Sequence, residues 1–284
     1  MRFAIVNEEK REAQKGLAGI CIGCEQPVIP KCGQIKVHHW AHASQCECDH
    51  WWENETEWHR SWKSNFPIEC QEVRHKAEDG AWHIADVKTK FGNTIEFQHS
   101  SLKHEERLAR NNFYGSDLVW VVDGLRREKD KSQFDLILKN SQMIYQNIQL
   151  IKLPSSIEEC TILKEWAECR IPVFFDFGVV LPLWCLLPKS TKGCFYAGPF
   201  SRQNFIDLHN GILTKNGQNF QDLMKTLNEI VFLYENPVKQ VYKQTNQALG
   251  NRRNLIQRQV EIPANPSRRY LNKLNRSSRR RGRL

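Results

Sequence analysis

The sequence predicts a mixed fold, α+β or α/β, whose central part has the order helix, three strands, helix, strand. Three observations lead to this prediction. Residues 83–100 alternate like a β-hairpin around a Gly-Asn turn, residues 55–63 before them have helical spacing, and residues 118–122 after them form an apolar segment. A cysteine- and histidine-rich segment precedes this centre, and a second α+β region and a basic tail follow it. We therefore expect four parts, with bounds 1–50, 51–154, 155–262 and 263–284.

The remaining elements of the central part follow from residue type. The apolar-rich segment 66–73 predicts the first strand, and the hairpin supplies the second and third. A basic helix is expected at 103–114, and the run 118–122 reads as a buried strand that ends at a turn. In the first helix, Glu55, His59 and Lys63 would share one face at positions i, i+4 and i+8.

The hairpin places acidic side chains where a core strand would have apolar ones. If its loop is 90–92, with Gly92 at positive φ, Asp86 lies across from Glu96. The two-residue period then puts Asp86, Glu96 and Gln98 on one face, opposite Ala85, Val87, Ile95 and Phe97. Two carboxylates about 5 Å apart at their Cβ atoms repel each other unless a cation lies between them. The alternative is an ordinary amphipathic hairpin whose polar face is solvated.

Five short motifs carry a family resemblance: Glu55-Thr56-x-x-His59-x-x-x-Lys63, His83-x-Ala85-Asp86, Ile95-Glu96-Phe97-Gln98-His99-Ser100, Arg110-x-x-Phe113-Tyr114 and Trp120-Val121-Val122-Asp123. Together they resemble the core of the PD-(D/E)XK nucleases, which have a restriction-endonuclease-like fold, and among these the competence-protein CoiA-like nucleases. The resemblance covers roughly residues 15–125. Members of that group also carry a small cysteine/histidine module ahead of the nuclease fold, and the segment from Cys21 to His42 resembles that module.

The resemblance implies a hydrolase that cleaves phosphodiester bonds of nucleic acid, DNA before RNA; a cytoplasmic location is expected from the cysteine content. Asp86 and Glu96 would hold catalytic Mg²⁺ or Mn²⁺, with Glu55 as a third carboxylate. His59 would contact a phosphate or pack the helix against the hairpin. Gln98 stands where most of the superfamily has a lysine, and glutamine brings no positive charge; Lys63 or Lys88 would then supply the cation. The alternative is an inactive nucleic-acid-binding or scaffold protein that keeps the fold.

Ten cysteines without an apolar leader at the start of the sequence favour a reducing compartment, where paired spacings indicate metal sites before disulfides. Cys21-x-x-Cys24 is half of a structural zinc site. By analogy with the family's H-x-A-H element, His39 and His42 complete it, although His38, Cys32, Cys46 and Cys48 compete. A metal-free ribbon is the alternative, but about 40 residues rarely build a sufficient core without a staple. The other cysteines, Cys70, Cys160, Cys169, Cys185 and Cys194, have apolar neighbours and are expected in the core.

The net charge of +9 is concentrated at the end of the chain. From Pro263 onward there is no acid and there are eight basic residues, whereas the remaining 33 basic residues nearly balance 32 acidic ones. An arginine-rich segment of this kind binds phosphates without sequence preference, or serves assembly. We expect it to bind nucleic acid through Arg268, Arg269, Lys273, Arg276, Arg279, Arg280, Arg281 and Arg283.

Residues 155–262 predict an α+β domain without an assignable chemistry. Strands are expected at 171–177, 179–187 and 194–198, and helices at 157–169, 200–209, 220–236 and 238–259. The longest apolar run is too short to span a bilayer, so no membrane association is expected. The domain would clamp substrate, form a homo-oligomer or bind a protein partner.

Overall fold

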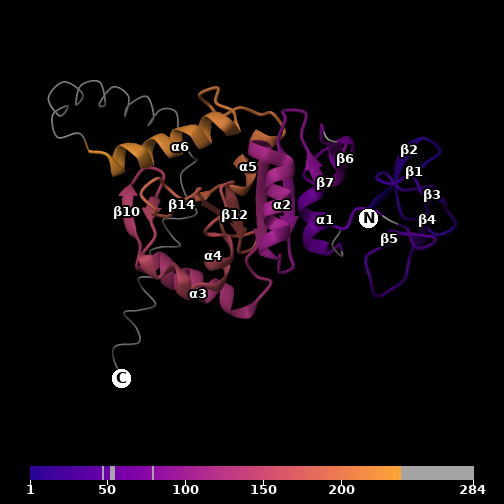
Figure 1. Cartoon of the computed structure of the whole chain (residues 1–284), viewed down its shortest axis with the longest axis horizontal. Coiled ribbons are helices and arrows are strands. Elements are labelled where there is room, and N and C mark those ends of the chain that lie inside the picture. The colour runs from indigo at the N-terminus through magenta and orange to yellow at the C-terminus, as the bar shows by residue number, and fades with distance from the viewer. Residues whose placement is uncertain (47, 52–54, 79, 238–284) are drawn as a thin grey trace. The chain divides into compact units, whose positions relative to one another are not determined.

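The computed structural model describes residues 1–46, 48–51, 55–78 and 80–237 (Figure 1). It is mixed α+β, with two sheets and six α-helices in these residues. Its contacts divide the chain into two compact units, which part between Val121 and Val122. The finer division at 50, 154 and 262 stays a prediction. The predicted helix 238–259 and all eight basic residues of the tail lie outside the described residues.

The first unit begins with a small antiparallel sheet in the strand order β2-β1-β3-β4-β5. Its strands are short. The turn between the first two strands is formed by Asn7 and Glu8, which both have positive φ. The strand bounds are Phe3–Val6 (β1), Glu9–Glu12 (β2), Gly19–Ile20 (β3), Pro27–Lys31 (β4) and His39–His42 (β5).

The part of the chain that follows has the predicted order of helix, three strands, helix and strand, and its last strand crosses the boundary between the two units. Its strands of the second sheet follow one another as β9-β8-β7-β6. The elements are α1 (Glu57–Lys63), β6 (Gln71–Lys76), β7 (Trp82–Lys88), β8 (Thr94–Gln98), α2 (His104–Tyr114) and β9 (Leu118–Asp123).

Two predicted bounds in this part are wrong. Helix α1 begins at Glu57, because Thr56 caps it: its hydroxyl accepts the His59 N–H, so Glu55 precedes the helix. The first strand begins at Gln71 rather than at residue 66. Pro67 has no N–H to give to a sheet, and a 3₁₀ turn, Ile68–Cys70, follows it.

The predicted hairpin register is confirmed. Strands β7 and β8 pair Val87 with Ile95, which makes Asp86 and Glu96 the next pair along the ladder. The Thr89 N–H donates to the Asn93 carbonyl and closes the three-residue loop. Gly92 has φ +94° within it, a conformation that favours glycine. The predicted core face is also confirmed, since Ala85, Val87, Ile95 and Phe97 are all buried.

The second unit carries antiparallel strands in the order β10-β11-β14-β13-β12. Two strands and two helices lie in predicted segments: β12 (Val173–Asp176), β13 (Leu183–Leu186), α5 (Arg202–His209) and α6 (Phe220–Glu235). The strand predicted at 194–198 is shifted by two residues, to β14 (Tyr196–Phe200). The predicted helix 157–169 is shorter, α4 (Thr161–Trp166), and follows a 3₁₀ segment, Ser155–Glu159. Three elements were not predicted from the sequence: α3 (Glu128–Lys139), β10 (Gln142–Tyr145) and β11 (Leu150–Lys152).

Two further predictions concern burial. Cys70, Cys160, Cys169 and Cys185 are buried as expected, whereas Cys194 is half-buried. Among the described residues, no helix combines the length and the apolar character that a bilayer crossing requires.

Candidate functional site

Acidic side chains from three strands and from the segment before α1 converge on one cavity of about 70 Å³ in the first unit, here called the carboxylate cavity. Its lining mixes these acids with a few basic and aromatic groups. The lining residues are Met1, Asp49, Trp51, Glu55, His59, Lys63, Glu72, Ile84, Asp86, Glu96, Phe97 and Arg110.

Three of the acids form a row across adjacent strands. Asp86 and Glu96 are neighbours through the hairpin register. On the other side, β6 pairs Gln71 with Val87, which places Glu72 opposite Asp86. Glu72 has φ +45°, an uncommon backbone conformation for a residue with a Cβ, and such outliers concentrate at functional sites. Glu72 was not predicted from the sequence, because its place in the row depends on a pairing between strands that no short turn specifies.

Lys63 lies among three of the carboxylates. Its Nζ is 3.0 Å from Glu55 Oε1, 2.9 Å from Glu72 Oε1 and 3.7 Å from Asp86 Oδ1. Burial by itself would lower the pKa of Lys63, but the carboxylates, Glu72 and Asp86 foremost, outweigh it and raise the pKa above its usual value. Lys63 is therefore a permanent positive charge within the cavity, although it belongs to α1 and not to the strand after the second acid.

Glu72 is held in its ionised form. Burial alone would raise the pKa of its carboxyl, yet Lys63, the α-amino group of Met1 and two backbone N–H groups lower it to about 2. The Arg2 N–H donates to Oε1 at 2.8 Å and the Phe3 N–H donates to Oε2 at 2.9 Å. Both oxygens of Glu72 thus accept hydrogen bonds within the protein. Glu72 is therefore better suited to orient Lys63 than to bind a ligand.

Glu96 has the opposite character. Burial and the charge of Asp86 raise its pKa to about 8, and Arg110 opposes them only in part. Arg110 Nη1 donates to Glu96 Oε2 at 3.1 Å. Among the described residues, the other oxygen, Oε1, is buried and has no hydrogen bond of good geometry, although the Tyr114 hydroxyl is near enough to the carboxyl to lower its pKa slightly. A buried acceptor left open in this way carries an energetic cost, which a bound cation would remove.

Of the other predicted site residues, His59 lines the carboxylate cavity, whereas Gln98 and Lys88 do not belong to its described lining. The Nε2 of His59 lies 3.0 Å from the Phe97 carbonyl, so its ring packs α1 against the hairpin. Gln98 is buried and donates to the Ser100 carbonyl at 3.1 Å; it is not among the described lining residues. Lys88 pairs with His75 Nδ1 at 2.8 Å.

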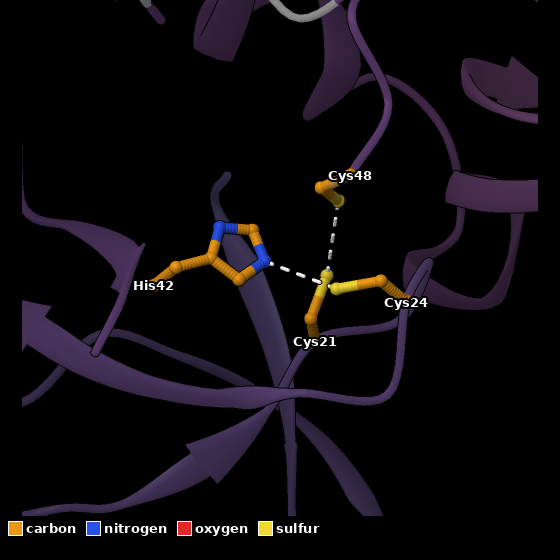
Figure 2. A group of neighbouring side chains, drawn as sticks. All are labelled: Cys21, Cys24, His42 and Cys48. Carbon is orange, nitrogen blue, oxygen red and sulfur yellow. Dashed lines mark hydrogen bonds between the residues drawn. The ribbon is translucent and has the colours of Figure 1, made fainter. Parts of the chain in front are cut away.

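A second group of side chains in the first unit has the composition of a zinc site. Cys21, Cys24, His42 and Cys48 point toward one another (Figure 2), and one ligand atom from each lies within 4.8 Å of the rest. Cys21 Sγ is 3.8 Å from Cys48 Sγ, and Cys24 Sγ is 3.2 Å from His42 Nε2. Tetrahedral zinc with bonds of about 2.3 Å to sulfur separates two sulfurs by about 3.8 Å. The donor set and its spacing therefore fit Zn²⁺.

His39 does not belong to this group. It lies three residues before His42 on β5, and side chains three apart on a strand point to opposite faces. Its Nδ1 lies 2.8 Å from the Val37 carbonyl instead. Cys48, one of the alternatives that the sequence left open, takes the fourth position.

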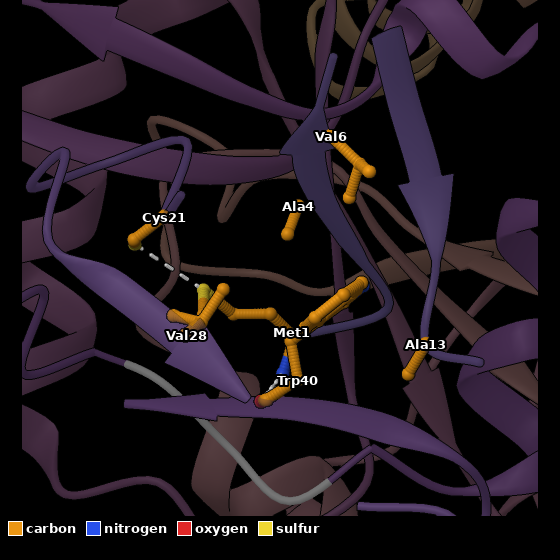
Figure 3. Packing of buried hydrophobic residues seen from close by; sticks show 7 residues of the cluster. All are labelled: Met1, Ala4, Val6, Ala13, Cys21, Val28 and Trp40. Carbon is orange, nitrogen blue, oxygen red and sulfur yellow. Dashed lines mark hydrogen bonds between the residues drawn. The ribbon is translucent and has the colours of Figure 1, made fainter. Parts of the chain in front are cut away.

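The apolar core beside this group is small (Figure 3). It consists of Met1, Ala4, Val6, Ala13, Cys21, Val28 and Trp40. Cys21 belongs both to this core and to the Cys/His group, and its Sγ lies 3.4 Å from the Met1 sulfur. So few buried side chains supply little stability on their own, which favours a metal as the additional staple.

Comparison with known proteins supports a CoiA-like assignment for the start of the chain. Residues 6–50 match the N-terminal domain of competence protein CoiA, and this segment contains all four members of the Cys/His group. No curated protein and no solved structure matches the chain. The predicted nuclease core, residues 51–154, lies beyond the matched segment.

Proposed function

We propose that the protein is a Mg²⁺- or Mn²⁺-dependent nuclease whose reaction takes place in the carboxylate cavity. The observation that carries this proposal is the open Oε1 of Glu96, buried beside Asp86 in a cavity that already contains a lysine. Carboxylate oxygens are the ligands that Mg²⁺ prefers. The PD-(D/E)XK resemblance supplies the reaction class, hydrolysis of phosphodiester bonds.

Asp86 and Glu96 would hold the metal ion, with Glu55 as the third carboxylate. Such an ion lowers the pKa of water and neutralises phosphate oxygens. Lys63 would stabilise the charge that develops on the phosphate, the task of the superfamily's missing lysine, because it reaches Asp86 from α1. Glu72 holds Lys63 in place, and His59 fixes α1 to the strand that bears Glu96. Gln98 would orient groups by hydrogen bonds only.

The same proposal covers the ends of the chain. A structural zinc ion in the Cys/His group would staple the N-terminal sheet, and the eight basic residues from Arg268 to Arg283 would bind the nucleic acid backbone. DNA is the proposed substrate before RNA, and the cytoplasm the proposed compartment. A protein or homo-oligomer partner would bind through residues 155–262.

A binding protein without turnover is the second candidate. Lys63 already neutralises part of the acidic row, and a pKa of about 8 leaves Glu96 largely protonated at neutral pH. If no metal ion displaces that proton, the cavity is a charge-balanced core and the chain binds nucleic acid without cleaving it.

One assay separates the two candidates. Purified protein is incubated with circular and linear DNA and with RNA, in Mg²⁺, Mn²⁺ or EDTA. Cleavage in the presence of metal that EDTA abolishes supports the nuclease, and cleavage of circular DNA identifies an endonuclease. Retention of nucleic acid on a filter without cleavage under any metal supports the binding protein.

A further inference from the structure

The Cys/His group and the carboxylate cavity are joined by one short stretch of chain. Cys48 belongs to the first, and Asp49 and Trp51 line the second. Consecutive Cα atoms are about 3.8 Å apart, so a displacement of Cys48 is passed directly to Asp49. The Asp49 side chain is only 5% exposed.

Asp49 is bonded to the strand that carries Asp86. Its Oδ2 accepts the Ile84 N–H at 2.7 Å, and its Oδ1 accepts from His83 Nδ1 at 2.8 Å. The Trp51 N–H also donates to Oδ1, at 3.0 Å. One carboxylate thereby fastens segment 48–51 to β7 two residues before Asp86.

Trp51 connects the same segment to β8, the strand that bears Glu96. Its carbonyl accepts from Arg110 Nη2 at 2.6 Å, while Nη1 of the same guanidinium donates to Glu96. The Trp51 ring stacks on His83, with ring centroids 3.2 Å apart and planes 12° from parallel. Arg110 therefore binds Glu96 and segment 48–51 at once, and because its guanidinium is planar and rigid, the position of one depends on the other.

We propose that Asp49 and Trp51 are positioning residues that couple the Cys/His group to the carboxylate cavity: metal binding at Cys48 seats segment 48–51, which holds Arg110 against Glu96 and fastens β7. This inference rests on the proposed nuclease function and on zinc in the Cys/His group. Outer partners of metal ligands commonly contribute about 10- to 100-fold in metal affinity or activity, although they never contact the metal.

The test uses the full-length, zinc-loaded protein and two readouts. The first is the hydrogen-exchange rate of the Ile84 amide, and the second is the dissociation constant for Mn²⁺, measured by electron paramagnetic resonance of the free ion. Asp49→Asn keeps the shape of the side chain and removes its charge. It should retain zinc by elemental analysis, raise the Mn²⁺ dissociation constant about tenfold and speed Ile84 exchange roughly fivefold, the effect of one weakened hydrogen bond.

Zinc removal from the parent protein by a chelator should reproduce the faster Ile84 exchange. Glu25→Gln is the matched control: Glu25 directly follows Cys24 in the sequence, but its partner is Arg74 at 2.9 Å, away from the cavity lining. This variant should match the parent in both readouts. Unchanged Ile84 exchange after zinc removal, or an unchanged Mn²⁺ dissociation constant in Asp49→Asn, overturns the coupling. If the protein neither binds Mn²⁺ nor cleaves, the proposed function fails, whereas zinc-dependent Ile84 exchange still establishes the connection.

Discussion

Each buried carboxylate of the cavity has its own set of partners, and these partners set its charge. Glu72 receives Lys63 and two backbone N–H groups, whereas Glu96 receives Arg110 on Oε2 and has only the Tyr114 hydroxyl as a further neighbour that lowers its pKa by hydrogen bonding. The two side chains lie in the same row of the sheet, yet one is a fixed anion and the other readily takes a proton. Glu72 can therefore hold Lys63 at any pH near neutrality, whereas Glu96 can bind a cation only when it has lost its proton.

Glu96 should make the metal-free protein less stable as pH rises. Its pKa is about 8 in the folded chain against 4.5 as the ordinary value, so folding retains a proton between these limits. The stability that Glu96 contributes is fully present below pH 4.5 and is lost as pH rises through 8. Glu96→Gln is therefore expected to show a smaller fall in Tm between pH 6 and pH 9, measured by calorimetry in EDTA. Equal falls in Tm for the variant and the parent would contradict the assignment.

Glu72 should act in the other direction. Its pKa of about 2 means that its stabilisation is present above pH 4.5 and is lost as pH falls toward 2. Glu72→Gln leaves Lys63 with less compensation, and breaking a buried ion pair costs about 3 kcal/mol. Urea unfolding at pH 7 measures this loss, which should shrink below pH 4.5. Glu69→Gln is the control, because the Glu69–Lys90 pair is exposed and contributes little.

Among the elements, the hairpin was predictable from sequence and its neighbours were less so. The alternation of Ala85 to Val87 and the turn at Gly92 are local, so they determine the register by themselves. The start of β6 depends on how Pro67 diverts the chain, and the position of Glu72 depends on a partner strand. Neither this strand pairing nor the hydrogen bonds from Asp49 to β7 leave a periodic pattern in the sequence, which is why Glu72 and Asp49 were missed.

The Cys/His group was half predictable for the same reason. Cys21 and Cys24 are joined by a local spacing, whereas Cys48 reaches the group through the fold of the chain. The family analogy favoured His39. Because side chains alternate along β5, however, His39 points to the face opposite His42 and away from the Cys/His group.

Cys48→Ser and His39→Asn should therefore differ. Elemental analysis should find about one zinc per chain in the parent and in His39→Asn, and much less in Cys48→Ser. Because metal binding in small modules contributes to folding, Cys48→Ser should also expose strands β1 to β5 to faster hydrogen exchange. Zinc retained in Cys48→Ser and lost in His39→Asn would restore the set expected from sequence.

At the scale of the whole molecule, charge separates the C-terminal end of the chain from the rest. The residues before Pro263 are nearly neutral, and the eight basic residues after it lie outside the described structure. The carboxylate cavity belongs to the first unit, which ends more than 140 positions before Pro263. Binding and chemistry are then expected to depend on different parts of the chain.

Truncation after Ile262 tests this separation. It should weaken nucleic-acid binding and flatten its salt dependence, because each phosphate contact contributes about 0.7 to 0.9 to the logarithmic slope. KM should rise while kcat at saturating substrate changes little. Both constants are measured at two salt concentrations for the truncated and full-length proteins. An unchanged slope would assign the tail to a protein partner or to localisation, and a collapse of kcat would place it in the reaction.

The central claim is that Asp86 and Glu96 hold the metal ion that cleaves nucleic acid. Its most direct test is the Mg²⁺-dependent cleavage rate of Asp86→Ala and Glu96→Ala, with Glu69→Gln as a folded control at the exposed side of the same unit. A metal ion contributes several kcal/mol to such a reaction, so each alanine variant should lose about a thousandfold in rate or more, while the control cleaves like the parent. Parental cleavage by either alanine variant, still abolished by EDTA, would place the metal elsewhere and contradict the assignment.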